Sequence, residues 1–162
     1  MKGHVVVHAF ERGRYLWTRE THNVTCRASK ATIAHLLGGD TASQNPGAPI
    51  TVIGFGSDAS PPTLISPTLA SDYFLTAPYY FKHVGTISYP IPGQVSFAWS
   101  LNGASDTGAL GINVQEIGLW CNPTGVSMPG TTSPNTLFAR ALLGLGVITS
   151  GVSFSSYWLE TA

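Results

Sequence analysis

The feature that most constrains the fold is a period-two alternation of large apolar and small side chains. It is clearest in the segment QVSFAWSLNG, where Val95, Phe97 and Trp99 alternate with serine and alanine. Successive side chains of a β-strand point to opposite faces, so this pattern predicts a strand with one buried face.

Comparable strand patterns recur along the chain between Gly- and Pro-rich turns, with no alternation of strands and long helices. They cover Val5–Phe10, 15–18, Ile50–Phe55, 79–90, 94–103, 111–121, 136–143 and 151–160. Gly13 separates the first two and can supply the positive φ of a tight hairpin turn. Seven or eight short strands of this kind predict a mainly β protein, an antiparallel β-sandwich that is jelly-roll-like, in a single domain over residues 1–162.

One segment has a helical pattern instead. Ser29 can cap a helix over residues 29–37, and Gly38 with Gly39 can end it in the left-handed conformation. Apolar side chains at Ile33 and Leu37 lie on one face, so we expect a short helix that covers a sheet face or one end of a barrel.

The charge content points to an assembly component. Of the 162 residues, eight are acidic and eight basic, and charged residues make up 10% of the chain against about 25% in ordinary globular domains. A surface with so little charge and no net charge associates readily. The basic residues form no stripe or block, so we expect no nucleic-acid partner.

The two cysteines, Cys26 and Cys121, are far apart in the sequence and form no CxxC pair. We expect two buried small hydrophobic residues, with a disulfide as the alternative. No apolar stretch reaches the roughly 20 residues that span a bilayer, and the N-terminal apolar run is too short for a signal peptide. The sequence therefore predicts a soluble protein without a membrane partner.

Motifs for catalysis or cofactors are lacking. The segment GFGSDA at 54–59 has the glycine spacing of a phosphate loop, but the prolines that follow prevent the helix such a loop requires. His4 and His8 share a strand face but lie about 13 Å apart, too far for one metal ion. Asp40 follows the end of the expected helix, and Asp58, Asp72 and Asp106 suit turn positions. We therefore expect no catalytic, cofactor-binding or metal site.

Two segments are candidates for contact with a partner. Aromatic residues cluster around Pro78, and they either line a subunit interface or pack inside a doubly buried strand or a tucked loop. The Thr/Ser/Pro/Gly-rich insert 122–135 is longer than a hairpin needs. The candidate interaction residues are Tyr73, Phe74, Tyr79, Tyr80, Phe81, Asn122, Met128, Thr131 and Asn135.

The segment QEIGLW, followed after a loop by TLFARALL, resembles a strand pair in a family of small tailed-bacteriophage virion proteins. That family has Glu-Ile/Ala-Gly-Leu-Phe, a turn, and then Thr-Leu-Phe-Ala-Arg. The opening hairpin with the segment at 29–39, and the stretch ITVIGFGSDASPP, are also similar. The loop between the two motifs is longer here than in the family, and the linker GLGVITSGVS replaces a segment with proline and lysine.

The resemblance implies a virion structural protein, assembled in the host cytoplasm and without enzymatic residues. We expect a capsid decoration or cement protein, dimeric or trimeric, that binds the major capsid protein. A tail, baseplate or fibre component is the alternative in the same class, and a carbohydrate-binding β-sandwich is the alternative in another. If the strands that carry Glu116 and Arg140 pair, these residues can form a structural salt bridge, within one chain or between subunits.

Overall fold

The computed structural model describes residues 2–25, 49–57, 59, 80–121 and 136–161. The described elements are β1 Lys2–Glu11, β2 Arg14–Thr25, β3 Ile50–Gly56, β4 Tyr80–His83, β5 Thr86–Ser88, β6 Gln94–Asn102, the 3-10 turn η1 Thr107–Ala109, β7 Asn113–Cys121, β8 Thr136–Val147 and β9 Val152–Thr161. Every strand pairing is antiparallel. The predicted mainly β, antiparallel class is confirmed.

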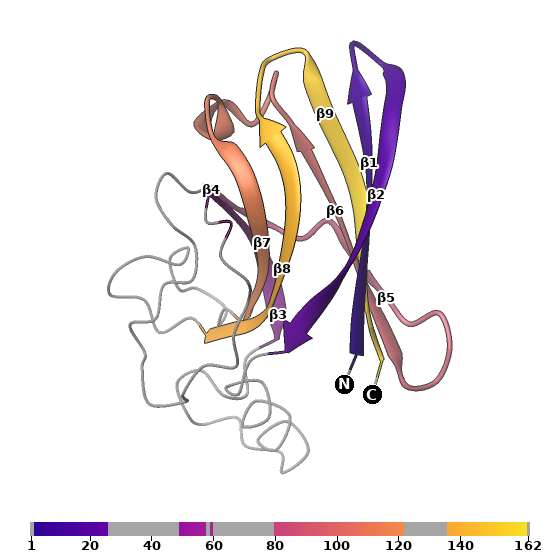
Figure 1. Ribbon diagram of the computed structural model, residues 1–162. Coiled ribbons are helices and arrows are strands. Elements are labelled where there is room, and N and C mark those ends of the chain that lie inside the picture. The colour runs from indigo at the N-terminus through magenta and orange to yellow at the C-terminus, as the bar shows by residue number, and fades with distance from the viewer. Residues whose placement is uncertain (1, 26–48, 58, 60–79, 122–135, 162) are drawn as a thin grey trace.

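The strands form two layers that face each other (Figure 1). One layer, sheet A, has the order β2-β1-β9-β6-β5, and the other, sheet B, has the order β4-β3-β7-β8. The structure is therefore a β-sandwich, and the jelly-roll connection pattern stays a prediction. The helix expected over 29–37 lies outside the described residues.

Each side of the sandwich is closed by a segment that is hydrogen-bonded first to one sheet and then to the other. On one side, β2 pairs with β1 along its length, and its last residues, Val24 and Thr25, pair with β8 of sheet B. On the other side, the Val84 N–H donates to the Thr51 carbonyl of sheet B, and the next N–H, of Gly85, donates to the Ala98 carbonyl of sheet A. The single strand expected over 79–90 is thus two strands, because the chain changes its partner layer at this corner.

The core fills the space between the layers. The inner faces contribute large apolar side chains, among them Trp158, Phe55 and Trp99, which are all buried. The Phe55 and Trp99 rings meet edge to face with centroids 5.2 Å apart. Burying each such side chain contributes about 1.5–3 kcal/mol. The alternation predicted for 94–103 is confirmed, since Phe97 and Trp99 are buried and Ser100 is exposed.

The β1–β2 hairpin turns at Arg12 and Gly13, whose φ angles are +47° and +79°. Two consecutive positive φ angles are typical of a type I′ turn, which matches the twist of the flanking strands. The role predicted for Gly13 is confirmed.

The loops at this end of the sandwich are joined by backbone hydrogen bonds. The Arg12 N–H donates to the Gly151 carbonyl at 2.9 Å, and the Gly103 N–H donates to the Val152 carbonyl at 3.0 Å. A Cβ atom on Gly103 would overlap the carbonyl oxygen of Thr149. Because the obstacle is backbone, it cannot move aside as the end of a flexible side chain can. Glycine at 103 is therefore required for the loop after β6 to meet the β8–β9 loop.

Replacing Gly103 with alanine should lower the free energy of unfolding by about 1–3 kcal/mol or more, as overpacking does. Urea unfolding at neutral pH measures the change. Gly85→Ala is the matched control, because a Cβ there would lie 3.4 Å from its nearest neighbour, the Ala98 carbonyl oxygen. Equal stability of the two variants would contradict the close approach at Gly103.

Candidate functional site

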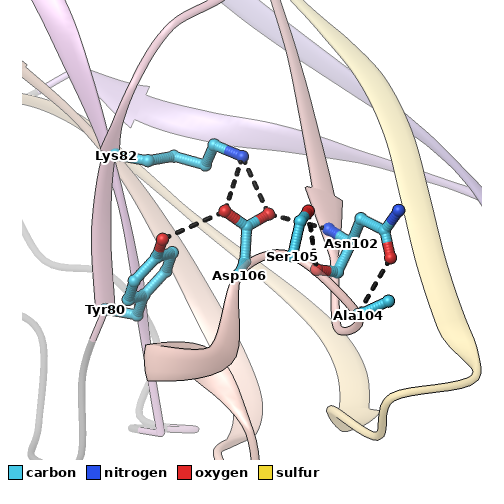
Figure 2. Close-up of polar contacts among 6 residues, drawn as sticks. All are labelled: Tyr80, Lys82, Asn102, Ala104, Ser105 and Asp106. Carbon is cyan, nitrogen blue, oxygen red and sulfur yellow. Dashed lines mark hydrogen bonds and ion pairs between the residues drawn. The ribbon is translucent and has the colours of Figure 1, made fainter.

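The densest polar cluster joins the edge of sheet B to the loop after β6 (Figure 2). Lys82 Nζ donates to both carboxylate oxygens of Asp106, at 3.0 and 2.8 Å. The Tyr80 hydroxyl donates to Asp106 Oδ1 at 3.0 Å, and the Asn102 N–H donates to Asp106 Oδ2 at 2.8 Å. Tyr80 and Lys82 are two residues apart on β4, so both side chains leave the same face of the strand.

These contacts decide the protonation of the cluster. Burial by itself raises the pKa of Asp106, but the hydrogen bonds from Lys82, Asn102 and Tyr80 outweigh it and hold the pKa below its usual value of 3.8. Burial, together with the hydrogen bond to the Asp106 carboxylate and its charge, raises the pKa of the Tyr80 hydroxyl above 10.0. At neutral pH the cluster therefore holds an ionised carboxylate with donors on both oxygens.

The cluster acts as a clamp between β4 and the loop after β6, and its polar groups are engaged with one another. Tyr80 also stacks on Phe55 of β3, with centroids 6.4 Å apart. A Cβ atom on Gly108 would lie 3.1 Å from the Tyr80 ring, so glycine makes room for the ring. Since every donor points at one carboxylate, Asp106 ties β4 of sheet B to a loop that follows sheet A. The turn position predicted for Asp106 is confirmed.

Replacing Asp106 with asparagine should destabilise the protein at neutral pH by about 1–3 kcal/mol, because hydrogen bonds to a charged group are lost. The pKa is lowered in the folded state, so the contribution is present above pH 3.8 and is lost as the pH falls through the folded value. Urea unfolding across the acid range should show a smaller acid-induced loss in Asp106→Asn than in the wild type. Tyr80→Phe keeps the ring packing and should destabilise the protein less than Asp106→Asn does. Identical acid profiles for the wild type and Asp106→Asn would refute the clamp.

A second ion pair lies on the outer side of sheet B. Arg140 of β8 donates through Nε to Glu116 Oε2 of β7 at 2.5 Å. The two strands pair so that Arg140 lies opposite Gly118, which places Glu116 diagonally across from it. The side chains are 6% and 0% exposed. The structure therefore brings these two residues together within one chain, and in a buried setting.

Among the described residues, a glycine and apolar side chains lie beside this pair. A Cβ atom on Gly56 of β3 would overlap Glu116 Oε1, so glycine leaves the space that the carboxylate occupies. On the same side of β7, Trp120 packs with Val52 and Leu137 in a small apolar cluster. A buried ion pair in such surroundings depends on both partners being present.

Removing one partner of this pair should cost about 3–5 kcal/mol, because the remaining buried charge loses the opposite charge that it contacts. We expect that loss for Arg140→Met and for Glu116→Gln, and a substantial recovery in the double variant. Thermal or urea unfolding of the four proteins measures the coupling. Additive losses would show that the pair is not coupled.

The described residues contain part of the predicted interaction set. Tyr80 and Phe81 are half-buried, and Phe81 meets Trp120 edge to face with centroids 5.8 Å apart. This placement corresponds to the packing alternative for the aromatic segment. Tyr73, Phe74, Tyr79, Asn122, Met128, Thr131 and Asn135 lie outside the described residues.

The outer side of sheet A has an extended region without charge. No charged residue or histidine occurs from Val84 to Ser105, or from Ala141 to Leu159. These stretches supply all of β5 and β6 and nearly all of β9, three neighbouring strands. We call their outward side chains the uncharged face: Thr86, Ser88, Ser96, Ala98, Ser100, Asn102, Ser153, Ser155, Tyr157 and Leu159.

Three large apolar or aromatic side chains on these strands and their turn are exposed. In the β5–β6 turn, Tyr89 is 77% exposed and Ile91 is 56% exposed, while Tyr157 of β9 is 41% exposed. Sequence reasoning identified the Pro90–Gly93 turn but missed its exposed side chains. The available signal was two prolines flanking an isoleucine at a turn, where neither Tyr89 nor Ile91 can reach the core.

The remaining polar groups of the described strands and turns do not cluster as metal ligands. Among the described residues, no group of three or more His, Cys, Asp and Glu could hold a metal ion. His4 instead contacts Glu20 at 3.2 Å, and its ring lies 5.2 Å from that of His22. Cys121 is buried, as expected of a small hydrophobic residue, and Cys26 lies outside the described residues.

Comparison of the chain with protein-family models, with curated proteins and with solved structures finds no match. In the part of the chain that the structure describes, no helix is long and apolar enough to cross a membrane.

Proposed function

We propose that this protein is a non-catalytic structural subunit of a tailed-phage virion, and that it decorates the capsid over the joints between major capsid subunits. The observation that supports this proposal most is the uncharged face on β5, β6 and β9, with Tyr89 and Ile91 exposed at its end. The assembly is proposed to be a phage virion because residues 115–120 and 136–143 resemble the virion protein family.

A surface that carries little charge is suited to adhesion. Small hydroxyl side chains and a few aromatic and aliphatic ones can approach a neighbour without desolvating ions. Such contacts depend weakly on salt, because screening acts on charges. On a regular lattice, many copies that each bind modestly give high overall retention. A homodimer or homotrimer adds to this multivalency.

A tail, baseplate or fibre subunit would use the same surface chemistry. The number of copies in each particle separates the two locations, since a shell holds hundreds of decoration sites and a tail holds far fewer of most components. Gel densitometry of purified particles against the major capsid protein gives this number.

The structure disfavours the carbohydrate-binding alternative, because the tryptophans on which a sugar would stack are not accessible. Trp99, Trp120 and Trp158 are 3%, 3% and 0% exposed. Trp17 is half-buried, packs against Phe154 and lies beneath the Arg19 guanidinium, 4.5 Å from its ring centroid. None of them offers the open ring on which a sugar stacks.

A charge placed on the uncharged face should release the protein from particles. We expect Tyr157→Glu to weaken retention at least about tenfold, because a carboxylate must then be desolvated in the contact. Val147→Glu is the matched control, as Val147 is an exposed apolar residue (55%) at the end of β8 in sheet B. Retention is measured by sedimenting decorated particles before and after a wash in molar salt.

The wild type and Val147→Glu should stay bound through the wash. Release of the wild type by salt alone would contradict adhesion through an uncharged surface. Equal retention of Tyr157→Glu and Val147→Glu would show that another surface makes the contact.

A further inference from the structure

Three neighbouring strands bring an amide and a carboxyl together at the end of the sandwich where the two chain ends lie side by side (Figure 1). Gly3 of β1 pairs with Asn23 of β2 on one side and with Glu160 of β9 on the other. A Cβ atom on Gly3 would overlap the Asn23 amide and lie 2.6 Å from Glu160 Oε1. Because glycine lacks this atom, the two side chains meet over it, and Asn23 Nδ2 donates to Glu160 Oε1 at 2.6 Å.

The hydrogen bonds of this pair are unevenly distributed. Glu160 Oε1 accepts a second bond, from Trp158 Nε1 at 2.9 Å. Glu160 Oε2 and Asn23 Oδ1 are both buried and have no hydrogen-bond partner. Two buried acceptors without donors are costly, and a carboxylate oxygen and an amide oxygen cannot satisfy each other.

The surroundings disfavour a charge on Glu160. The residue is 2% exposed, and its partner on β6 is Val95. No described Lys, Arg or His forms an ion pair with it: His4 contacts Glu20, and His22 Nδ1 contacts the Gly3 carbonyl. Burial raises the pKa of the Glu160 carboxyl above 4.5, although the bonds from Trp158 and Asn23 and the charge of the α-amino group oppose it.

A single proton supplies the missing donor for both orphaned acceptors. We propose that the folded protein holds Glu160 as the neutral acid, in a cyclic pair in which Glu160 Oε2–H donates to Asn23 Oδ1 while Asn23 Nδ2–H donates to Glu160 Oε1. All the acceptors of the two side chains then have a partner. The pair also crosslinks β2 and β9 over β1 without placing a charge inside the sandwich.

The pair makes the stability of this end depend on pH in the sense opposite to that of Asp106. The pKa of Glu160 is raised by folding, so the folded state binds its proton more tightly than the unfolded chain does. Stability from this group is complete below pH 4.5 and declines as the pH rises toward the folded pKa, above which it stays constant.

Glu160→Gln tests the proposal, because glutamine reproduces the neutral acid. Its Nε2–H can donate to Asn23 Oδ1, and its carbonyl oxygen can accept from Asn23 Nδ2. We expect the variant to unfold in urea at pH 7 no more readily than the wild type, and to lose the decline in stability above pH 4.5. Asp106→Asn is the control, since it should change the acid side of the profile and leave this decline in place.

A second measurement observes the protonation of Glu160 directly. Carbon-13 NMR of the Glu160 side-chain carboxyl in the wild type should give the chemical shift of a protonated acid at a pH where exposed glutamates are ionised. Infrared spectra should show the matching protonated-carboxyl band, and Glu160→Gln should remove it.

Two results would overturn the proposal. One is an ionised Glu160 by NMR, together with a rise of more than about tenfold in the unfolding constant of Glu160→Gln, the loss expected of a charge-assisted network. The other is stabilisation of the wild type by added sodium or calcium that Glu160→Gln abolishes, because a cation would then bridge the two acceptors in place of the proton.

Discussion

The structure depends on burying the apolar inner faces of two sheets against each other, with both lateral gaps closed by the chain itself. β2 leaves sheet A to pair with β8, and the corner at Val84 and Gly85, between β4 and β5, is hydrogen-bonded first to β3 and then to β6. Once these closures fix the spacing of the layers, Phe55, Trp99 and Trp158 fill the interior. The outward side chains of β5, β6 and β9 do not pack in this core.

The closed sandwich handles its few charged groups in contrasting ways. Asp106 stays ionised because Lys82, Tyr80 and a backbone N–H direct donors at it. Glu116 stays buried beside Arg140, in space that Gly56 leaves open. Glu160 has donors on one oxygen alone, which is why a neutral acid fits it best. Each solution depends on which donors the tertiary structure brings within reach.

Much of the fold could be read from the sequence, because strand periodicity and turn chemistry are local. The alternation at 95–100 and the glycine turn at Gly13 are both present as expected. The split of 79–90 into β4 and β5 could not be read, because its two halves look alike and differ only in their partner strands. In the candidate site, the pairing of Glu116 with Arg140 was foreseen as conditional on strand pairing, whereas the Asp106 clamp was foreseen only as a turn.

The sequence by itself determined the β class, the hairpin positions and the scarcity of charge, since each is a property of neighbouring residues or of composition. Tertiary structure alone decided which charge-free strands lie next to one another, and so made β5, β6 and β9 a continuous face. It alone placed Asn23 and Glu160, which are 137 positions apart, on either side of Gly3. The physical reason is that strand order and register are set by burial of the whole core, which no local segment encodes.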